Sequence, residues 1–185
     1  MIRLIGLSCS LVLLYAGAAQ AQGSITVIGG GLAEVCSKAV RAGRFEQQVL
    51  DACSIALETE ALRRRDRAAT YNNRGIVYLR MMDLDEALSD FERAERLNPN
   101  IGELFVNRGA VLISQRKHAE ALAQIDRGLT MGIEEPHKAY YNRAIAKEAL
   151  DDMRGAYFDY KKAVELDPTW TLPQTQLARF TVTTR

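Results

Sequence analysis

The chain has 185 residues, of which 48% are hydrophobic and 25% are charged. This composition excludes a disordered chain and a polytopic membrane protein, and the length allows one domain with a sizeable core. The 24 basic and 23 acidic residues give a net charge of +1. Because nucleic-acid binders need a strongly basic face, this balance argues against a nucleic-acid partner.

Residues 1–21 have the pattern of a secretory signal peptide. The segment holds a single charge, Arg3, then an apolar stretch, and it ends in a small-x-small site, Ala19-Gln20-Ala21. The apolar stretch is shorter than the roughly 20 residues that a spanning helix needs, so we expect cleavage and no membrane span in the mature chain. The predicted location is a bacterial periplasm. The alternative is a chain tethered to the membrane by its uncleaved N-terminal segment.

Residues 22–31 are glycine-rich, and we expect a flexible N-terminus there. Gly29-Gly30-Gly31 follows a short apolar run, as in the strand-to-helix turn of a dinucleotide-binding fold. However, Glu34 stands where that motif needs glycine or alanine, and no second strand follows at the required spacing. A nucleotide-dependent enzyme that uses the Gly29–Gly31 turn is therefore a minor alternative, and we expect no cofactor.

Residues 32–67 contain two stretches of helical periodicity and then a basic linker. Cys36 and Cys53 lie at equal distances from the turn between the two stretches, so their side chains should meet across antiparallel helices. We predict a disulfide between them, because exported proteins fold in oxidising compartments. Two free buried thiols are the alternative. A catalytic cysteine is disfavoured because no histidine lies near in sequence.

The linker, residues 58–67, includes the run Arg63-Arg64-Arg65. We expect it to be helical and solvated. A basic patch for an acidic partner is an alternative, but a short run of charges is usually a hydrated surface.

A pattern with a period of about 34 residues governs the rest of the chain. Asn73-Arg74-Gly75 recurs as Asn107-Arg108-Gly109 and as Asn142-Arg143-Ala144. In each copy an aromatic residue precedes the small residue, and an alanine, a bulky residue and another small residue follow it at constant offsets. These residues are Tyr71, Ala87, Phe91 and Ala94, then Phe105, Ala121, Ile125 and Gly128, then Tyr140, Ala156, Tyr160 and Ala163.

This set resembles the tetratricopeptide repeat (TPR), a helix-turn-helix unit of 34 residues. The resemblance implies an all-α fold, a right-handed TPR superhelix (an α-α solenoid) of stacked hairpins, because one hairpin cannot bury its apolar face alone. The implied repeats are residues 68–101, 102–136 and 137–170. Residues 32–67 then form a degenerate N-terminal hairpin with its linker helix, and residues 171–185 form a C-terminal capping helix and a frayed tail.

Within a repeat, the residue types predict how the two helices meet. Gly75 and Ala94 are nearly equidistant from the turn, so we expect them to face each other. Asp83 with Glu86 has the spacing of a capping box for the second helix. Asn98 before a proline should end that helix, because the residue before proline disfavours helical dihedrals.

The resemblance also implies a concave face lined by the first helix of each repeat, which suits an extended peptide or a partner helix. We therefore expect a non-enzymatic adaptor for a protein or peptide. An asparagine amide can both donate and accept, so the repeated asparagines can hold a peptide backbone or bond to the neighbouring hairpin, and both readings stay open. The predicted partner-binding residues are Asn72, Asn73, Arg80, Glu103, Asn107, Lys138, Tyr141 and Asn142.

Some TPR domains hold a C-terminal carboxylate in a clamp of Lys, Asn and Arg side chains. Asn107 and Lys138 match that clamp, but Asn72, Ile76 and Asn142 stand where it needs Lys, Asn and Arg. Two ligands of five do not make the clamp, so we do not expect chaperone-tail binding of this kind.

The remaining polar residues give little support to an enzyme. His118 and His137 have no metal-ligand spacing to Cys, Asp or Glu, so we expect no metal site. Asp151-Asp152 lies in the turn of the third repeat and is expected to cap a helix rather than form a catalytic dyad. The alternative to an adaptor is a structural module that associates with itself through exposed apolar helix faces, as a weak homo-oligomer.

Overall fold

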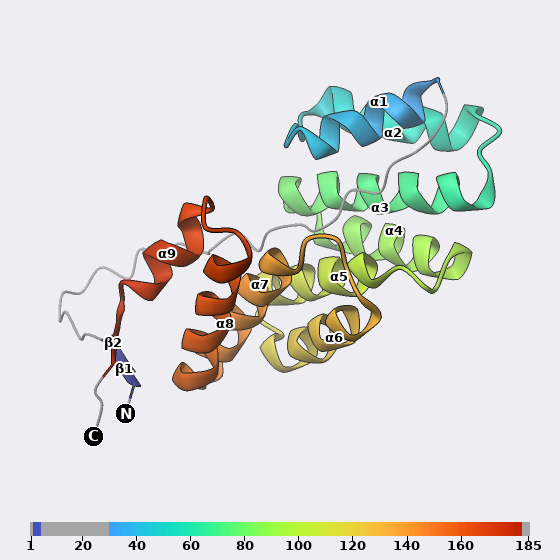
Figure 1. Cartoon of the computed structure of the whole chain (residues 1–185). Coiled ribbons are helices and arrows are strands. Elements are labelled where there is room, and N and C mark those ends of the chain that lie inside the picture. The colour runs from blue at the N-terminus through green and yellow to red at the C-terminus, as the bar shows by residue number, and fades with distance from the viewer. Residues whose placement is uncertain (1, 5–29, 183–185) are drawn as a thin grey trace.

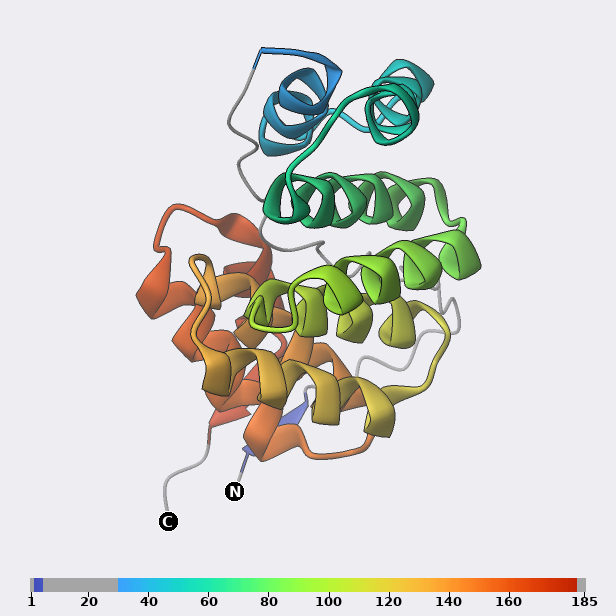
Figure 2. The ribbon, with the colours of Figure 1, turned by 90° about the vertical axis from the view of Figure 1, so that its right-hand side faces the viewer.

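The computed structural model describes residues 2–4 and 30–182. Within these residues the chain folds into nine α-helices, eight of which pair as antiparallel hairpins stacked side by side (Figures 1 and 2). None of the helices in this part of the chain is long and apolar enough to cross a bilayer. Apart from residues 2–4, the predicted signal peptide lies outside the described residues.

The four hairpins follow one another in chain order. They are formed by α1 (Leu32–Arg41) with α2 (Gln47–Thr59), α3 (Arg64–Met81) with α4 (Leu84–Leu97), α5 (Gly102–Ser114) with α6 (His118–Met131), and α7 (Pro136–Ala149) with α8 (Met153–Leu166). The short helix α9 (Thr171–Leu177) packs on α8. The predicted all-α class is confirmed.

The turn inside each hairpin is built in the same way. The three repeats place Met82, Arg116 and Asp151 in the left-handed region, with φ of 67°, 61° and 63°, and the N-terminal hairpin places Gly43 there, with φ of 72°. The next amide then donates to the carbonyl five residues back, which closes the end of the first helix. These bonds join Asp83 to Tyr78, Lys117 to Leu112, Asp152 to Lys147 and Arg44 to Ala39, at 2.8–3.0 Å.

In the first two repeats, the small residue of the first helix receives a bulky side chain from the second helix. A Cβ added to Gly75 would lie 2.6 Å from Cε1 of Phe91, and one added to Gly109 would lie 2.5 Å from Cγ1 of Ile125. The expectation that Gly75 faces Ala94 is therefore wrong. The glycine lets the helices approach because it makes room for the ring of Phe91 between them.

In the described part of the chain, three clusters of buried residues run through the stack, of which the smallest, Ala33, Ala56 and Ala69, joins α1, α2 and α3. The largest joins the N-terminal hairpin to the first two repeats, from Cys36 to Ile125 and on to Ala146 of α7. The second cluster joins the third repeat to the C-terminal segment, where Phe180 packs with Tyr160. Each hairpin thus buries its apolar face against its neighbours.

The helix ends confirm part of the predicted capping. Asn98 and Asp167, each before a proline, are extended, with φ of −146° and −139°. Oδ1 of Asp152 accepts from the amide of Gly155 at 2.9 Å and caps α8. The capping box predicted at Asp83 is wrong, because the side chain of this N-cap residue accepts no hydrogen bond from the helix.

The segments that flank the repeats differ from the predictions. The linker is not one helix: α2 ends at Thr59, a non-helical segment follows, and α3 already begins at Arg64, before the predicted repeat boundary. The tail is not frayed over its whole length. Strand β2 (Phe180–Val182) pairs antiparallel with β1 (Ile2–Leu4), inside the segment predicted to be cleaved.

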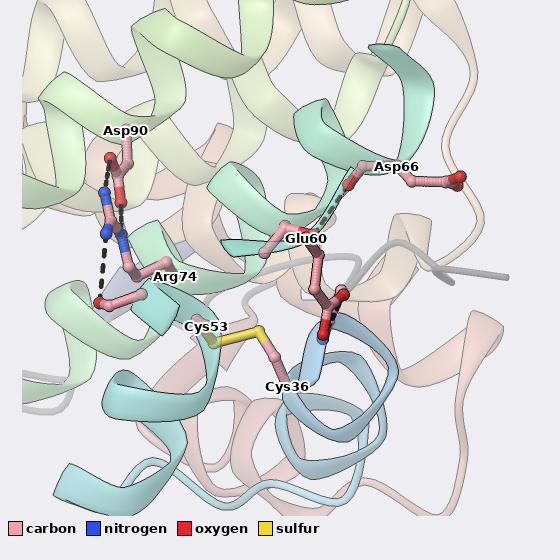
Figure 3. The surroundings of a disulfide bond; sticks show 9 residues. Cys36, Cys53, Glu60, Asp66, Arg74 and Asp90 are labelled. Atoms are coloured by element: carbon pink, nitrogen blue, oxygen red, sulfur yellow. Dashed lines mark hydrogen bonds and ion pairs between the residues drawn. A yellow bond between two sulfur atoms is a disulfide. The ribbon is translucent and has the colours of Figure 1, made fainter. Parts of the chain in front are cut away.

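A disulfide joins the two helices of the N-terminal hairpin. It links Cys36 of α1 to Cys53 of α2, with a Cα–Cα distance of 5.0 Å, and both residues are fully buried (Figure 3). The two cysteines lie at the same height on antiparallel helices, and the bond closes a loop with a sequence separation of 17. The hairpin at the end of the stack is therefore held covalently.

Removing this bond should lower the stability of the chain. A cross-link over this separation reduces the conformational entropy of the unfolded chain, which raises the free energy of the unfolded state by about 3 kcal/mol in the chain-entropy model. We expect the double variant Cys36→Ala/Cys53→Ala to melt at a lower temperature than the oxidised wild type, and its melting to be unaffected by reductant. Thermal unfolding followed by circular dichroism, with and without reductant, measures both effects. Equal melting of oxidised and reduced wild type would contradict the prediction.

Candidate functional site

The tetratricopeptide resemblance assigns five positions of the first helix in each copy to the concave face: the second, fifth, ninth, twelfth and thirteenth. Most of the apolar side chains at these positions are buried, whereas Ile145 is partly exposed and Ala149 is exposed. The buried ones are Ala69, Ile76, Leu79, Val106, Ala110, Ile113 and Tyr141. The polar members keep part of their surface exposed: Arg80, Glu103, Ser114, Lys138 and Glu148. We call these five the polar rim. This face therefore offers a partner basic side chains, acidic side chains and one hydroxyl group.

The predicted asparagines do not share this exposure. Asn72, Asn73, Asn107 and Asn142 are all 0% exposed. The amide Nδ2 of Asn107 in α5 donates to Oδ1 of Asn72 in α3 at 2.8 Å, so this pair joins two successive repeats. The expectation that these side chains lie open to a partner is not met, and at Asn72 and Asn107 the interpretation as a contact between hairpins is the better one.

The other predicted partner-binding residues make contacts within the chain and keep polar groups near the surface. The guanidinium of Arg80 lies 5.0 Å from the ring centroid of Phe45. Oε1 of Glu103 accepts from the amide of Glu134 at 3.1 Å. Nζ of Lys138 lies 2.7 Å from Oε2 of Glu135, and the Lys138 side chain is 28% exposed.

Tyr141, by contrast, belongs to the core. Its ring lies 4.8 Å from that of Trp170, between centroids, and burial raises the pKa of its hydroxyl. The neighbouring Tyr160 is buried too, which raises its pKa, so its hydroxyl stays protonated and donates to Glu148 at 3.1 Å. Aromatic packing therefore holds the third repeat against the C-terminal segment.

The arginine that follows each repeated asparagine holds helices together. In the first repeat, Nε and Nη2 of Arg74 donate to the two carboxylate oxygens of Asp90 at 2.6 and 2.9 Å (Figure 3). Nη1 of the same side chain reaches Ser54 of α2 at 3.2 Å. Burial lowers the pKa of Arg74 most strongly, but the hydrogen bonds to Asp90 and the charge of that carboxylate act together with Tyr78 and Tyr71 to raise it above its ordinary value. One side chain thus joins α3, α4 and the preceding hairpin.

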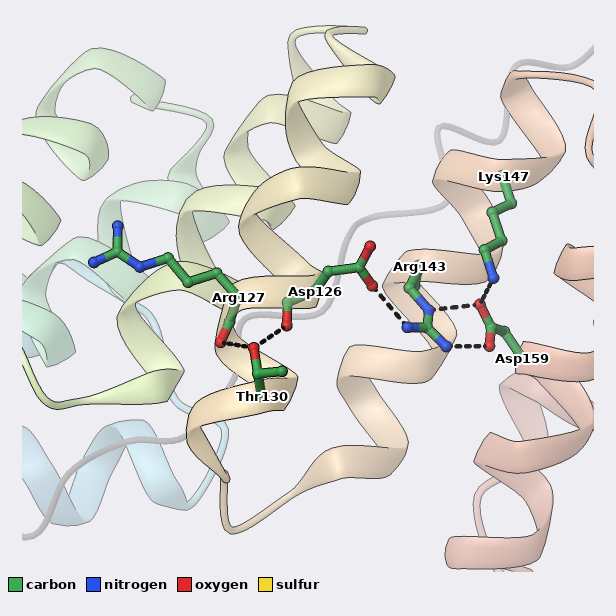
Figure 4. A network of polar contacts seen from close by, with 6 residues as sticks. All are labelled: Asp126, Arg127, Thr130, Arg143, Lys147 and Asp159. Carbon is green, nitrogen blue, oxygen red and sulfur yellow. Dashed lines mark hydrogen bonds and ion pairs between the residues drawn. The ribbon is translucent and has the colours of Figure 1, made fainter.

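The third repeat has the same arrangement. Arg143 donates to both oxygens of Asp159 at 2.8 and 2.7 Å, and its Nη1 donates to Asp126 of the preceding repeat at 2.7 Å (Figure 4). Lys147 adds a second cation 2.8 Å from Asp159. The hydrogen bonds to Asp159 raise the pKa of Arg143 although burial opposes its charge.

The middle repeat uses another partner. The residue 16 positions after Arg108 is Gln124, which cannot form an ion pair, and Nη1 of Arg108 instead contacts Glu95 of the preceding repeat at 2.7 Å. The pattern of an acid 16 residues after the arginine, present at Asp90 and Asp159, was visible in the sequence and could have identified these pairs.

The glycine turn before α1 is closed by a carboxylate of the chain itself. The amides of Leu32 and Ala33 donate to the side-chain oxygens of Glu60, and a Cβ added to Gly31 would lie 2.6 Å from one of them (Figure 3). An anion therefore already occupies the helix N-terminus that a pyrophosphate would need. This argues against a pyrophosphate at Gly30 and Gly31, whereas Gly29 of the predicted turn lies outside the described residues.

The two histidines lie in different environments. Burial lowers the pKa of both His118 and His137, which favours their neutral form. His137 lies edge-on to Trp170 with ring centroids 5.4 Å apart. Among residues 2–4 and 30–182, no group of three or more His, Cys, Asp and Glu side chains is placed to hold a metal ion.

Breaking an arginine contact between repeats should destabilise the fold. Arg143→Ala leaves the carboxylate of Asp159, which is 6% exposed, with only Lys147 as an ion-pair partner in the described structure. We expect the free energy of unfolding to fall by about 2–3 kcal/mol, measured by urea denaturation. Arg154→Ala, at an exposed position of α8, should change it by less than about 0.5 kcal/mol. If both variants unfold at the same urea concentration, these contacts do not stabilise the stack.

Comparison with known proteins matches the repeat architecture. Family models described as "Tetratricopeptide repeat" match residues 68–101 and 137–169. The chain is 30% identical over 123 residues to RNA polymerase II-associated protein 3 of Xenopus tropicalis, which covers 66% of this chain and 18% of that protein. It is 29% identical over 91 residues to Hsp70-Hsp90 organizing protein 2 of Arabidopsis thaliana, which covers 49% of this chain and 16% of that protein. The chain therefore spans less than a fifth of these relatives.

Solved structures share the fold at low sequence identity. A TPR protein of Thermus thermophilus superimposes with a TM-score of 0.63 at 19% identity, over 80% of this chain and 78% of that one. The first TPR domain of Spaghetti (RPAP3) superimposes with a TM-score of 0.57 at 24% identity, over 62% of this chain and 90% of that one. With the helical hairpins and the matched repeats, these likenesses establish that the chain contains tetratricopeptide repeats stacked in an all-α superhelix.

Proposed function

We propose that the chain is a non-enzymatic adaptor that binds a peptide or a partner helix on the concave face of its repeats. The observation that carries the proposal is the polar rim on α3, α5 and α7, which lies beside a buried apolar floor contributed by the same helices. Such a surface is already formed before the ligand arrives, so little conformational entropy is lost on binding.

The similar proteins support a peptide as ligand. The first TPR domain of Spaghetti (RPAP3) was solved with the HSP90 peptide SRMEEVD bound to it. The Arabidopsis thaliana relative is named as an organizing protein of Hsp70 and Hsp90. Both are TPR proteins whose names connect them to other proteins rather than to a reaction.

The ligand we propose is an internal peptide segment or a helix, not a C-terminal carboxylate. The cations that a carboxylate clamp would need are replaced by Asn72 and Asn142, and both amides are buried. Asn107 bonds to Asn72, and Lys138 is paired with Glu135. Of the two residues that match the clamp, Asn107 is therefore engaged within the chain, and the partly exposed Lys138 alone does not make the clamp.

We also propose that the chain works in the bacterial cell envelope. The signal-like segment at residues 1–21 and the disulfide between Cys36 and Cys53 support this location. Disulfides persist in oxidising compartments such as the periplasm and are rare in the cytosol.

Self-association is a second candidate, favoured by apolar side chains on the hairpin at the end of the stack. Val35 of α1 is 50% exposed and Ile55 of α2 is 44% exposed. Light scattering over a concentration series separates the candidates. We expect a monomer mass for the adaptor, whereas a dimer that Val35→Ser/Ile55→Ser dissociates would establish the structural module.

The adaptor proposal predicts that the polar rim decides which protein is captured. We expect Arg80→Gln/Lys138→Gln to lower the yield of the partner by at least about tenfold, because charge-assisted hydrogen bonds to a ligand are lost at two repeats. Crosslinking in intact cells, followed by quantitative identification of the captured proteins, measures this yield.

The matched control is Lys161→Gln/Lys162→Gln, which removes two positive charges from exposed positions of α8. It should capture the partner as the wild type does, and both double variants should keep the wild-type helical circular dichroism. If the rim variant and the control capture the same proteins in the same amounts, the concave face is not the binding surface.

A further inference from the structure

A pocket of about 370 Å³ lies between the start of α3 and the end of α4, the two ends of the first repeat. It is lined by Arg64 and Arg65 in the first turn of α3 and by the end of α4, at Leu97, Asn98 and Pro99. Its volume falls within the range of ligand sites, roughly 300–1,000 Å³. None of these residues belongs to the polar rim or to the apolar floor of the concave face.

The two arginines of this pocket differ from those of the repeat contacts. Arg74, Arg108 and Arg143 each pair with a carboxylate. Arg64 and Arg65 are exposed and form no ion pair within the described part of the chain.

One hydrogen bond directs a guanidinium toward the pocket. Nη2 of Arg64 donates to the backbone carbonyl of Arg96 at 3.3 Å, which ties the side chain to the last turn of α4. A guanidinium has five N–H donors, so most of those on Arg64 are left for a ligand. The first turn of α3 also contains Asp66, but Arg63, Arg64 and Arg65 outnumber it, so the local charge is positive.

The lining favours an acidic peptide over a small anion. Guanidinium groups bind carboxylates with two parallel hydrogen bonds, which adds direction to charge. Leu97 and Pro99 place apolar surface beside these groups. A peptide that alternates acidic and apolar side chains can use both kinds of surface, whereas a small anion can use only the charge.

We propose that this pocket is a second binding site, for an acidic peptide segment in which apolar residues stand beside glutamate or aspartate. This pocket is distinct from the concave face, so a negative result for the pocket would leave the adaptor proposal untouched. The interaction is electrostatic in large part, so its affinity should fall as ionic strength rises.

Fluorescence anisotropy with the purified chain tests the proposal. The probe is a labelled, amidated peptide of alternating glutamate and leucine, and the comparison peptide has glutamine in place of glutamate. We expect Arg64→Gln/Arg65→Gln to weaken binding of the glutamate peptide at least about fivefold, and Arg64→Lys/Arg65→Lys to weaken it less. The glutamine peptide should bind the wild type no better than it binds the glutamine variant.

The matched control is Arg116→Gln/Arg154→Gln, which removes two positive charges from exposed positions in other repeats and should leave the affinity unchanged. Circular dichroism checks that each variant keeps its helices. Equal binding of both peptides, or wild-type affinity in Arg64→Gln/Arg65→Gln, would overturn the site. Displacement of the peptide by inorganic phosphate or by vesicles of anionic phospholipid at equal concentration would overturn the assignment to a peptide.

Discussion

The close approach of two helices within each hairpin is the contact on which the rest of the structure depends. Gly75 makes room for the ring of Phe91, and Gly109 makes room for Ile125. Because both bulky residues are fully buried in this contact, the width of a hairpin is set by one glycine and one side chain. The second helix of each hairpin packs against the first helix of the next repeat, so this close approach contributes to the spacing of the side chains that a partner can meet.

Polar contacts then fix how the hairpins sit on one another. Apolar packing alone is non-directional and tolerates small rotations between neighbouring units. The bidentate pairs of Arg74 and Arg143 are directional, and each arginine also reaches a side chain of the hairpin before it, Ser54 or Asp126. The stack is therefore held by an apolar interior that supplies most of the stability and by arginines that select one orientation.

The repeats could be predicted from the sequence because their signal lies in residue types at fixed offsets. The shared turn could not, because its left-handed position is held by Met82, Arg116 and Asp151, which have no residue type in common and include no glycine. The partners of the small residues were misjudged because distance from the turn ignores which face of a helix a side chain occupies. The burial of Asn72 likewise depends on contacts between repeats that sequence spacing does not contain.

Structural and binding residues can be told apart because every copy of the repeat packs against the same kind of hairpin but contacts a different part of a ligand. The asparagine and the arginine are identical in all three copies, as expected for side chains whose neighbours within the stack are the same kind of hairpin each time. A ligand presents different groups along its length, so positions that contact it have no reason to repeat. Glu103 and Lys138 occupy one such position, and Arg80 and Ser114 occupy another, and all four keep exposed surface. Variation between copies, rather than repetition, is thus the better sign of a binding residue in this chain.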